Sequence, residues 1–212
     1  MNSASKAPPL ATRLVTERLE LRPPRPGDVP ELRRVLRKNA EHLRPWSRKA
    51  RSGEDPTSLT ALSKAVLTDR SEWRQGKAFA FLATARELDA PIMGRLALTN
   101  VTRGALEGAS LGYWIDMDRQ SKGLTTEAVR AVLDFAFGPA ALHRVQVNVM
   151  PRNIASLRVI EKLGLRNEGL AVRLLQIAGE WEDHLMFAVT AEEWNPRAHL
   201  MPQPAPKPPP GG

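Results

Sequence analysis

The segment from Gln120 to Thr125 has the composition of an anion-binding loop. It follows an apolar run and precedes a segment in which apolar residues recur at helical spacing. The first N–H groups of a helix have no partner within the helix, and they attract negative charge. Gly123 allows a ligand to approach the backbone closely, and Lys122 adds a positive charge. This arrangement of residue types is suited to a pyrophosphate group.

The loop lacks the two common glycine-rich phosphate motifs. Neither GxxxxGK followed by Ser or Thr nor GxGxxG occurs in the chain. Gln120 and Gly123 instead match the pattern Gln/Arg-x-x-Gly-x-Gly/Ala, and Thr125 departs from its last, small position. The segment therefore resembles the acyl-CoA pyrophosphate loop of the GNAT acetyltransferases. Within that family, the RimJ/RimL type of ribosomal-protein N-terminal acetyltransferase tolerates variation at this position.

Asn153 and Ser156 stand one helical turn apart at the start of an expected helix, so their side chains share a face. By residue type alone, Asn153 is a good N-cap and Ser156 is an unremarkable residue of the first turn. The resemblance implies that Asn153 contacts the pantetheine arm of the cofactor. It also implies that Ser156 protonates the departing CoA thiolate, directly or through a bound water. The two roles of Asn153 are compatible, whereas Ser156 is either a catalytic acid or a structural residue.

The strand-like run before the loop ends in Trp114, Ile115 and Asp116. In GNAT enzymes this strand parts from its neighbour and lends backbone groups to the acyl-pantetheine arm, and by resemblance that role falls to these three residues. A backbone N–H there can polarise the thioester carbonyl as an oxyanion donor does. The alternative is an ordinary central strand. The residues expected to contact acetyl-CoA are Trp114, Ile115, Asp116, Gln120, Ser121, Lys122, Gly123, Leu124, Thr125 and Asn153.

No residue stands out as a general base. Some RimL-type enzymes carry a glutamate on the strand after the closing helix, and the corresponding stretch, 173–176, has none. Glu41, Glu107 and Asp116 are the other candidates, and each is better explained as a solvated or ion-paired carboxylate. A peptide α-amine has a pKa of about 7.7–8.0 and is about one quarter neutral near pH 7.4, whereas a lysine amine is about one thousandth neutral. A site without a base therefore favours an α-amine acceptor.

The segment from Asn39 to Trp46 resembles the acceptor-side loop of RimJ-type enzymes, which assigns Glu41 and Trp46 to the acceptor side. Trp46 and its apolar neighbours could form a wall for the acceptor. A core position beneath the loop is equally compatible with a tryptophan. Tyr113, the only tyrosine, is expected to pack in the core rather than to act as an acid.

The elements that must position these residues alternate along the chain. Asp28 is expected to cap the first helix, Gly164 to end the last one in a left-handed conformation, and residues 178–180 to form a hairpin turn. The periodicity predicts strands at about 14–22, 78–86, 91–101, 110–116, 144–149, 171–177 and 184–190, helices at about 28–38, 56–75, 123–137 and 153–163, and a loop at 39–55. The order of these elements resembles that of the GNAT fold over 13–194. The resemblance implies an α/β domain with a mixed, mostly antiparallel central sheet of about seven strands and about four helices.

The composition narrows the class of protein. The 212 residues are read as a disordered tail at 1–12, one GNAT domain at 13–195 and a Pro-rich tail at 196–212. The net charge is +8, but no recognised nucleic-acid-binding motif accompanies it, so nucleic acid is not expected as a substrate. The chain has no cysteine, which excludes thiolate catalysis, and its four histidines lack metal-ligand spacing. No apolar run or signal peptide suggests a membrane or an export route, so a cytoplasmic protein is expected.

The resemblance implies an N-acetyltransferase that moves acetyl from acetyl-CoA to an amine in a ternary complex, without a covalent enzyme intermediate or a metal. The preferred acceptor is the N-terminal α-amine of a protein, including ribosomal proteins. A small-molecule amine or antibiotic is the first alternative, which an acidic or narrow acceptor pocket would favour. A non-catalytic CoA-binding interaction module is the second. The protein is expected to be a monomer or a homodimer.

Overall fold

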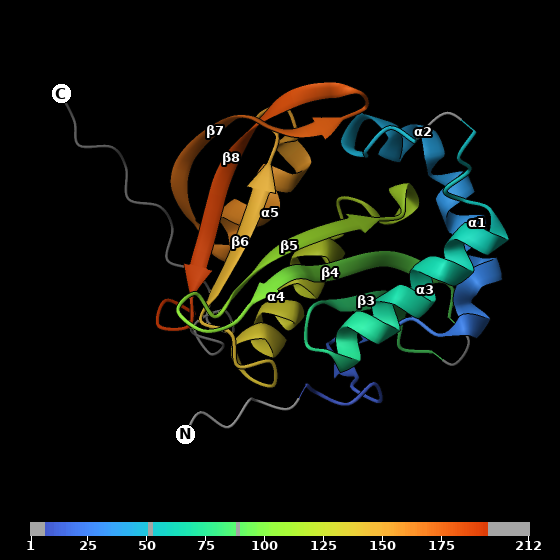
Figure 1. The fold of residues 1–212 in the computed structure, drawn as a ribbon, viewed down its shortest axis with the longest axis horizontal. Coiled ribbons are helices and arrows are strands. Elements are labelled where there is room, and N and C mark those ends of the chain that lie inside the picture. Colours follow the sequence, from blue (N-terminus) through green and yellow to red (C-terminus); the bar gives the residue numbers. More distant parts are fainter. Residues whose placement is uncertain (1–6, 51–52, 88–89, 195–212) are drawn as a thin grey trace.

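The computed structural model describes residues 7–50, 53–87 and 90–194, which form an eight-stranded sheet with helices on both faces (Figure 1). The strands lie in the order β1-β2-β3-β4-β5-β6-β8-β7, and β5–β6 is the one parallel pair within this sheet. The strands are β1 (Leu14–Val15), β2 (Leu19–Arg22), β3 (Phe79–Ala85), β4 (Ile92–Thr102), β5 (Gly108–Ile115), β6 (Arg144–Val149), β7 (Arg166–Ile177) and β8 (Glu180–Thr190). The helices are α1 (Val29–Lys38), α2 (Ala40–Leu43), α3 (Leu59–Arg74), α4 (Leu124–Phe137) and α5 (Ile154–Leu163), with short 3-10 turns η1 (Pro26–Asp28), η2 (Arg44–Trp46) and η3 (Met117–Arg119).

The α/β class and the order of the elements confirm the prediction, although the described residues form eight strands and five α-helices instead of about seven and four. The predicted strand 14–22 is divided because Thr16 N donates to Leu19 O, at 2.9 Å, and so makes a turn between β1 and β2. The prediction of a loop at 39–55 is wrong at 40–46, which form α2 and η2. Buried Asn39 marks the start of this segment: its side chain donates to Val35 O at 2.9 Å and to Asp116 Oδ1 at 3.1 Å.

Two apolar clusters pack on opposite faces of the sheet. Helix α4 has apolar residues at helical spacing, and with α5 it covers one face. There Trp73, Phe79, Phe81 and Phe135 form an aromatic group with ring centroids 5.0–5.6 Å apart. Helices α1 and α3 cover the other face through Val29, Leu32, Val35, Leu62 and Val66, which pack on Leu82 and Ile92.

Strands β5 and β6 separate along their length, as expected for the strand before the loop. Their parallel pairing covers only Gly108–Ser110 of β5 and Arg144–Gln146 of β6, whereas β5 continues to Ile115 and β6 to Val149. Figure 1 shows the two strands diverging toward their carboxyl ends. A sheet that opens in this way leaves backbone groups of β5 without a neighbouring strand on one side.

The structure agrees with only some of the capping and turn residues predicted at the ends of the elements. Gly164 has φ 68 and ends α5 as predicted, and Ala178 and Gly179, with φ 51 and 102, make the tight turn between β7 and β8. Asp28 precedes α1 but does not cap it with its side chain. Its carboxylate instead accepts from the Arg22 guanidinium at 2.7 and 2.8 Å and from Arg25 N at 2.6 Å. The ion pair is the stronger attraction for this carboxylate.

The prediction of a disordered tail at 1–12 is wrong for residues 7–12. Pro8 O accepts a hydrogen bond of 2.7 Å from Trp73 Nε1, and Leu10 packs against the main core. Residues 1–6 and the Pro-rich stretch 196–212 lie outside the described residues, so the boundaries of the predicted domain at 13–195 stay a prediction.

Candidate functional site

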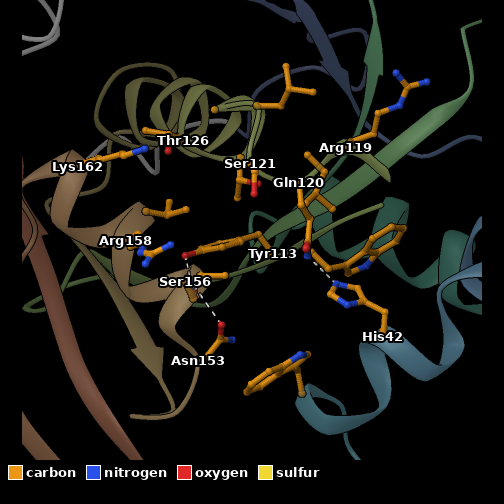
Figure 2. Close-up of a pocket in the computed structure, with 18 of the residues that line it drawn as sticks. His42, Tyr113, Arg119, Gln120, Ser121, Thr126, Asn153, Ser156, Arg158 and Lys162 are labelled. Carbon is orange, nitrogen blue, oxygen red and sulfur yellow. Dashed lines mark hydrogen bonds between the residues drawn. The ribbon is translucent and has the colours of Figure 1, made fainter. Parts of the chain in front are cut away.

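A cavity of about 460 Å³ opens where β5 and β6 part (Figure 2). It is bounded by the α2–η2 segment, the end of β5, the loop before α4 and the exposed side of α5. Its size falls within the range of about 300–1,000 Å³ typical of small-molecule sites. The described residues that line it are His42, Leu43, Trp46, Tyr113, Trp114, Ile115, Arg119, Gln120, Ser121, Gly123, Leu124, Thr125, Thr126, Asn153, Ala155, Ser156, Arg158, Val159 and Lys162.

The start of α4 faces this cavity without a side-chain cap. Gly123 occupies the N-cap position with φ 75, whereas Ser58 caps α3 and Asn153 caps α5 through their side chains. The first N–H groups of α4 are therefore available to an anion. Of the predicted loop residues, Lys122 does not line the cavity: its Nζ donates to Asp118 O at 3.1 Å.

The positive charge of the cavity comes instead from Arg119, Arg158 and Lys162 (Figure 2). None of the described lining residues is an aspartate or glutamate. Sequence reasoning missed these three cations. Arg158 and Lys162 are four residues apart and so share one face of α5, a spacing that is visible in the sequence once that face is known to line a site.

The backbone N–H and C=O groups of successive β5 residues point alternately toward β4 and toward the gap between β5 and β6. Trp114 pairs with Arg95 of β4, and Asp116 N donates to Met93 O at 2.7 Å. Because successive residues of a strand direct their backbone groups to opposite sides, Tyr113 and Ile115 face the gap beside β6. Three residues were predicted to lend backbone groups to the cofactor. The backbone of Ile115 faces the gap, whereas Trp114 pairs with β4, and Asp116 is hydrogen-bonded through its N to Met93 O and through its O to Arg119 N.

The carboxylates considered as general bases all lie outside the cavity lining. Asp116 is 6% exposed and accepts from Lys38 Nζ at 2.9 and 3.0 Å; burial alone would raise its pKa, but these bonds and those from Asn39 and Asp118 N lower it. The Glu107 side chain accepts from Arg103 and Gly104 N at the opposite end of β5, which lowers its pKa. Glu41 is exposed on α2 and pairs with Arg44 at 3.2 Å.

Three side chains form a connected group on the wall of the cavity. Tyr113 OH and Ser156 Oγ are 2.7 Å apart, in a hydrogen bond in which either hydroxyl can donate. Ser156 N donates to Asn153 Oδ1 at 3.1 Å, so Asn153 caps α5 with its oxygen and keeps its amide nitrogen for other partners. Burial raises the pKa of Tyr113 to about 12, against the smaller lowering effect of the Ser156 bond. Tyr113 packs against the core, as predicted, but its hydroxyl also reaches the site.

The α2–η2 segment, which was predicted to lie on the acceptor side, contributes His42, Leu43 and Trp46 to the cavity lining. The Gln120 amide nitrogen lies 2.8 Å from His42 Nε2, which links the loop to α2. Trp46 is half-buried and lines the cavity, and the Arg152 guanidinium lies 5.2 Å from its ring centroid. Arg152 also donates to Pro45 O at 3.4 Å and pairs with Glu182 of β8. His42 was missed by the sequence reasoning, which judged histidines only by metal-ligand spacing.

The described residues contain no group of three or more His, Cys, Asp or Glu side chains that could hold a metal ion. Nor is any described helix long and apolar enough to cross a membrane.

Comparisons with known proteins agree with this geometry. A family model described as an acetyltransferase (GNAT) domain matches residues 18–166. The probable N-acetyltransferase YjcK of Bacillus subtilis is 46% identical over 101 residues, a stretch that spans 56% of that relative. The ribosomal protein uS5-alanine N-acetyltransferase of Escherichia coli is 32% identical over 185 residues, covering 87% of this chain and 93% of that relative.

Solved structures show the same arrangement of elements. RimJ of Mycobacterium smegmatis, in complex with CoA-disulfide, superposes with a TM-score of 0.77 at 35% identity, covering 86% of this chain and 87% of that one. The ribosomal-protein-S5-alanine acetyltransferase of Vibrio fischeri gives a TM-score of 0.79 at 26% identity, covering 87% and 99% of the two chains.

Proposed function

This chain belongs to the GNAT acetyltransferase family, and from that membership we propose that it transfers acetyl from acetyl-CoA to the N-terminal α-amine of a protein. The observation that carries the proposal is that an uncapped helix start and a hydroxyl pair, Tyr113–Ser156, share one cavity. The first suits the pyrophosphate of CoA, and the second can supply a proton to its sulfur.

The donor end of the cavity fits CoA. The N–H groups at the start of α4, together with Arg119, Arg158 and Lys162, offer partners for phosphate oxygens. The unpaired backbone of Tyr113 and Ile115 in the β5–β6 gap offers N–H and C=O groups to the acyl-pantetheine arm. The Asn153 amide nitrogen can donate to the same arm.

The transfer is a direct displacement at the thioester carbonyl. The amine nitrogen attacks the carbonyl carbon, a C–N bond forms and the C–S bond breaks. The amine gives up one proton to water. Ser156 Oγ–H gives its proton to the CoA sulfur and regains one from solvent. Because the pKa of Tyr113 is about 12, its hydroxyl stays protonated and can donate to Ser156 Oγ, which directs the serine proton into the cavity.

The charge of the cavity favours an α-amine of a peptide. A cationic acceptor such as a polyamine calls for carboxylates, and the described lining contains none and carries three cations. Without a lining carboxylate to serve as base, an amine that is partly neutral near pH 7.4 is the better nucleophile. The similarity to the E. coli uS5-alanine N-acetyltransferase along most of both chains supports the same class of acceptor.

The decisive experiment compares two forms of one peptide with acetyl-CoA. The first has a free N-terminus and a blocked lysine, and the second has a blocked N-terminus and a free lysine. We expect turnover of the first form only. Preference for the second form, or for a small-molecule amine over both, would replace the N-terminal assignment with a lysine or small-amine acceptor. If CoA binds and no amine is acetylated, the protein is a non-catalytic CoA-binding module.

A further inference from the structure

The back of the pyrophosphate loop, away from the cavity, is held by an ion pair between the chain start and α4. Glu127 lies in the first turn of α4, and Arg18 lies in the turn between β1 and β2. Arg18 binds the Glu127 carboxylate through its backbone N at 2.8 Å, through Nε at 2.7 Å and through Nη2 at 2.6 Å. Thr16 Oγ1 donates to the same carboxylate at 2.6 Å. None of these three residues lines the cavity.

The same arginine also contacts the loop backbone. Arg18 Nη1 donates to Lys122 O at 2.8 Å. The residues on either side of Lys122 have left-handed backbones, with φ 59 at Ser121 and φ 75 at Gly123. A non-glycine residue rarely adopts this conformation without support from its surroundings. Arg18 is therefore placed to stabilise the loop in the form that exposes its N–H groups to the cavity.

Glu127 places an ionised carboxylate close to the anion-binding start of α4, and Arg18 neutralises its charge. Its carboxylate is mostly buried, with 14% of the side chain exposed, and hydrogen bonds from Thr16 and Arg18 outweigh the effect of burial and lower its pKa. It is therefore ionised near neutral pH. It lies three residues after Leu124, about 5 Å along the helix axis from the anion-binding end. That distance is within the screening length of about 8 Å at physiological ionic strength, so an unpaired carboxylate there would repel a bound pyrophosphate.

We propose that Arg18 is a positioning residue for the CoA pyrophosphate, which neutralises Glu127 beside the anion site and fixes the loop through Lys122 O. The inference rests on the proposed assignment of this loop to CoA. It predicts that the chain start, remote in sequence from the loop, controls cofactor affinity without touching the cofactor.

The test measures CoA affinity by calorimetry for Arg18→Ala, Glu127→Gln and the double variant. Arg18→Ala leaves a carboxylate unpaired and releases the loop, so CoA should bind about 10- to 100-fold more weakly, as for the loss of charge-assisted hydrogen bonds. Glu127→Gln removes the repelling charge and should bind CoA within about threefold of the wild type. The double variant should recover at least about threefold of the affinity lost in Arg18→Ala, because its repelling charge is gone.

Arg13→Ala is the matched control. Arg13 pairs with Glu20 near the same strands, and its side chain is 50% exposed, against 47% for Arg18. It should leave CoA affinity unchanged. In steady-state assays Arg18→Ala should raise the KM for acetyl-CoA and leave kcat close to the wild-type value, since Arg18 contacts neither Ser156 nor Tyr113 in the structure.

The outcomes distinguish failure of the role proposed for Arg18 from failure of the proposed function. If Arg18→Ala binds CoA as tightly as Arg13→Ala, the inference is overturned. If the double variant binds as weakly as Arg18→Ala, the neutralising role of Arg18 is overturned. A fall in kcat with an unchanged KM would also contradict it. Wild-type protein that fails to bind CoA would instead overturn the assignment of the donor site, and with it the proposed function.

Discussion

At the scale of single residues, the proposed chemistry uses hydroxyl groups rather than charged side chains. Ser156 is half-buried, faces the cavity and is held between Tyr113 and the cap formed by Asn153. A hydroxyl held in this way has one proton to give and a defined direction in which to give it. This geometry supports a role for Ser156 after cofactor binding rather than in it.

Ser156→Ala should lower turnover by about 10²- to 10⁴-fold, the usual contribution of a general acid. Affinity for acetyl-CoA should change little, because the Asn153 cap uses the Ser156 backbone N–H, which alanine keeps. The measurement is kcat together with CoA affinity. Ser71→Ala, which alters an exposed serine of α3, is the control. Turnover close to that of the wild type would make Ser156 a structural residue.

Tyr113→Phe tests the second hydroxyl of the pair. It keeps the ring that packs against the core and removes the atom 2.7 Å from Ser156 Oγ. We expect a fall in kcat of about fivefold, corresponding to the ~1 kcal/mol of one hydrogen bond, with an unchanged KM for acetyl-CoA. An unchanged kcat would show that Ser156 needs no partner to orient it.

At the scale of the elements, the start of α4 and the gap between β5 and β6 carry the groups that we propose bind the cofactor. The loop can approach a ligand because Gly123 carries no side chain at φ 75. A Cβ built there has only the Arg18 guanidinium within 4 Å, at 3.4 Å, so a substitution would affect the loop and its contact with Arg18 rather than the core.

Gly123→Val should weaken CoA binding by more than about tenfold, because a branched residue strains the backbone at φ 75 and crowds the Arg18 guanidinium, and so disturbs the loop that exposes the N–H groups of α4. Gly53→Val is a closely matched control: Gly53 has φ 76, no neighbour within 4 Å of a built Cβ and no place in the cavity lining. Both variants carry similar backbone strain, and calorimetry with CoA compares them. Equal CoA affinity in the two folded variants would remove the loop from the cofactor site.

The α2–η2 segment and the β7–β8 hairpin meet at the end of the cavity that we propose binds the acceptor. Ala178 N of the hairpin turn donates to Ser47 O at 2.9 Å, and Arg152 connects Trp46 to Glu182. Arg152→Ala should raise the KM for a peptide acceptor about three- to tenfold, from a cation–π contact of ~0.5–1 kcal/mol and the loosening of the segment. The KM for acetyl-CoA should be unaffected. Arg166→Ala, at the opposite end of β7, is the control; an unchanged acceptor KM in Arg152→Ala would dissociate Trp46 from acceptor binding.

At the scale of the whole molecule, the cavity is lined by cations and not by carboxylates. Arg119, Arg158 and Lys162 line it, and none of its described lining residues is an aspartate or glutamate. The net charge of +8 is therefore partly concentrated where an anionic cofactor would bind. Under the proposed function no lining carboxylate deprotonates the acceptor, so the pH dependence of the reaction should follow the pKa of the acceptor amine.

For a peptide with a free N-terminus, kcat/KM should climb through about pH 7.7–8.0 and then level, as the α-amine loses its proton. Tyr113 should not reduce the rate at alkaline pH below about 11, since its pKa of about 12 keeps it protonated. The measurement is the pH profile of wild type and of His42→Gln with one peptide. A rise of kcat/KM with pH that is present in the wild type and lost in His42→Gln would identify His42 as a general base. It would contradict the expectation that deprotonation of the acceptor amine sets the pH dependence.

Local sequence patterns predicted most of the elements and the loop, because these depend on neighbouring residues. Apolar spacing set α4 and α5, Gly164 ended α5, and Gly123 marked the helix start that faces the cavity. The family resemblance identified the strand that parts from its neighbour, but not which of its residues face the gap. The gap itself depends on the limited pairing of β5 with β6, and the pairing of β5 with β4 decided that Tyr113 and Ile115, rather than Trp114 and Asp116, face it.

Only the tertiary structure brought together the residue pairs on which the site depends. Tyr113 and Ser156 are 43 residues apart, His42 and Gln120 are 78 apart, and Arg18 and Glu127 are 109 apart. The same holds for charge: packing turned Lys122 and Asp116 toward Asp118 and Lys38, and turned Arg158 and Lys162 toward the cavity. Local sequence patterns encode backbone conformation through short-range sterics, whereas the partner of a polar side chain is fixed only when the sheet and its helices pack.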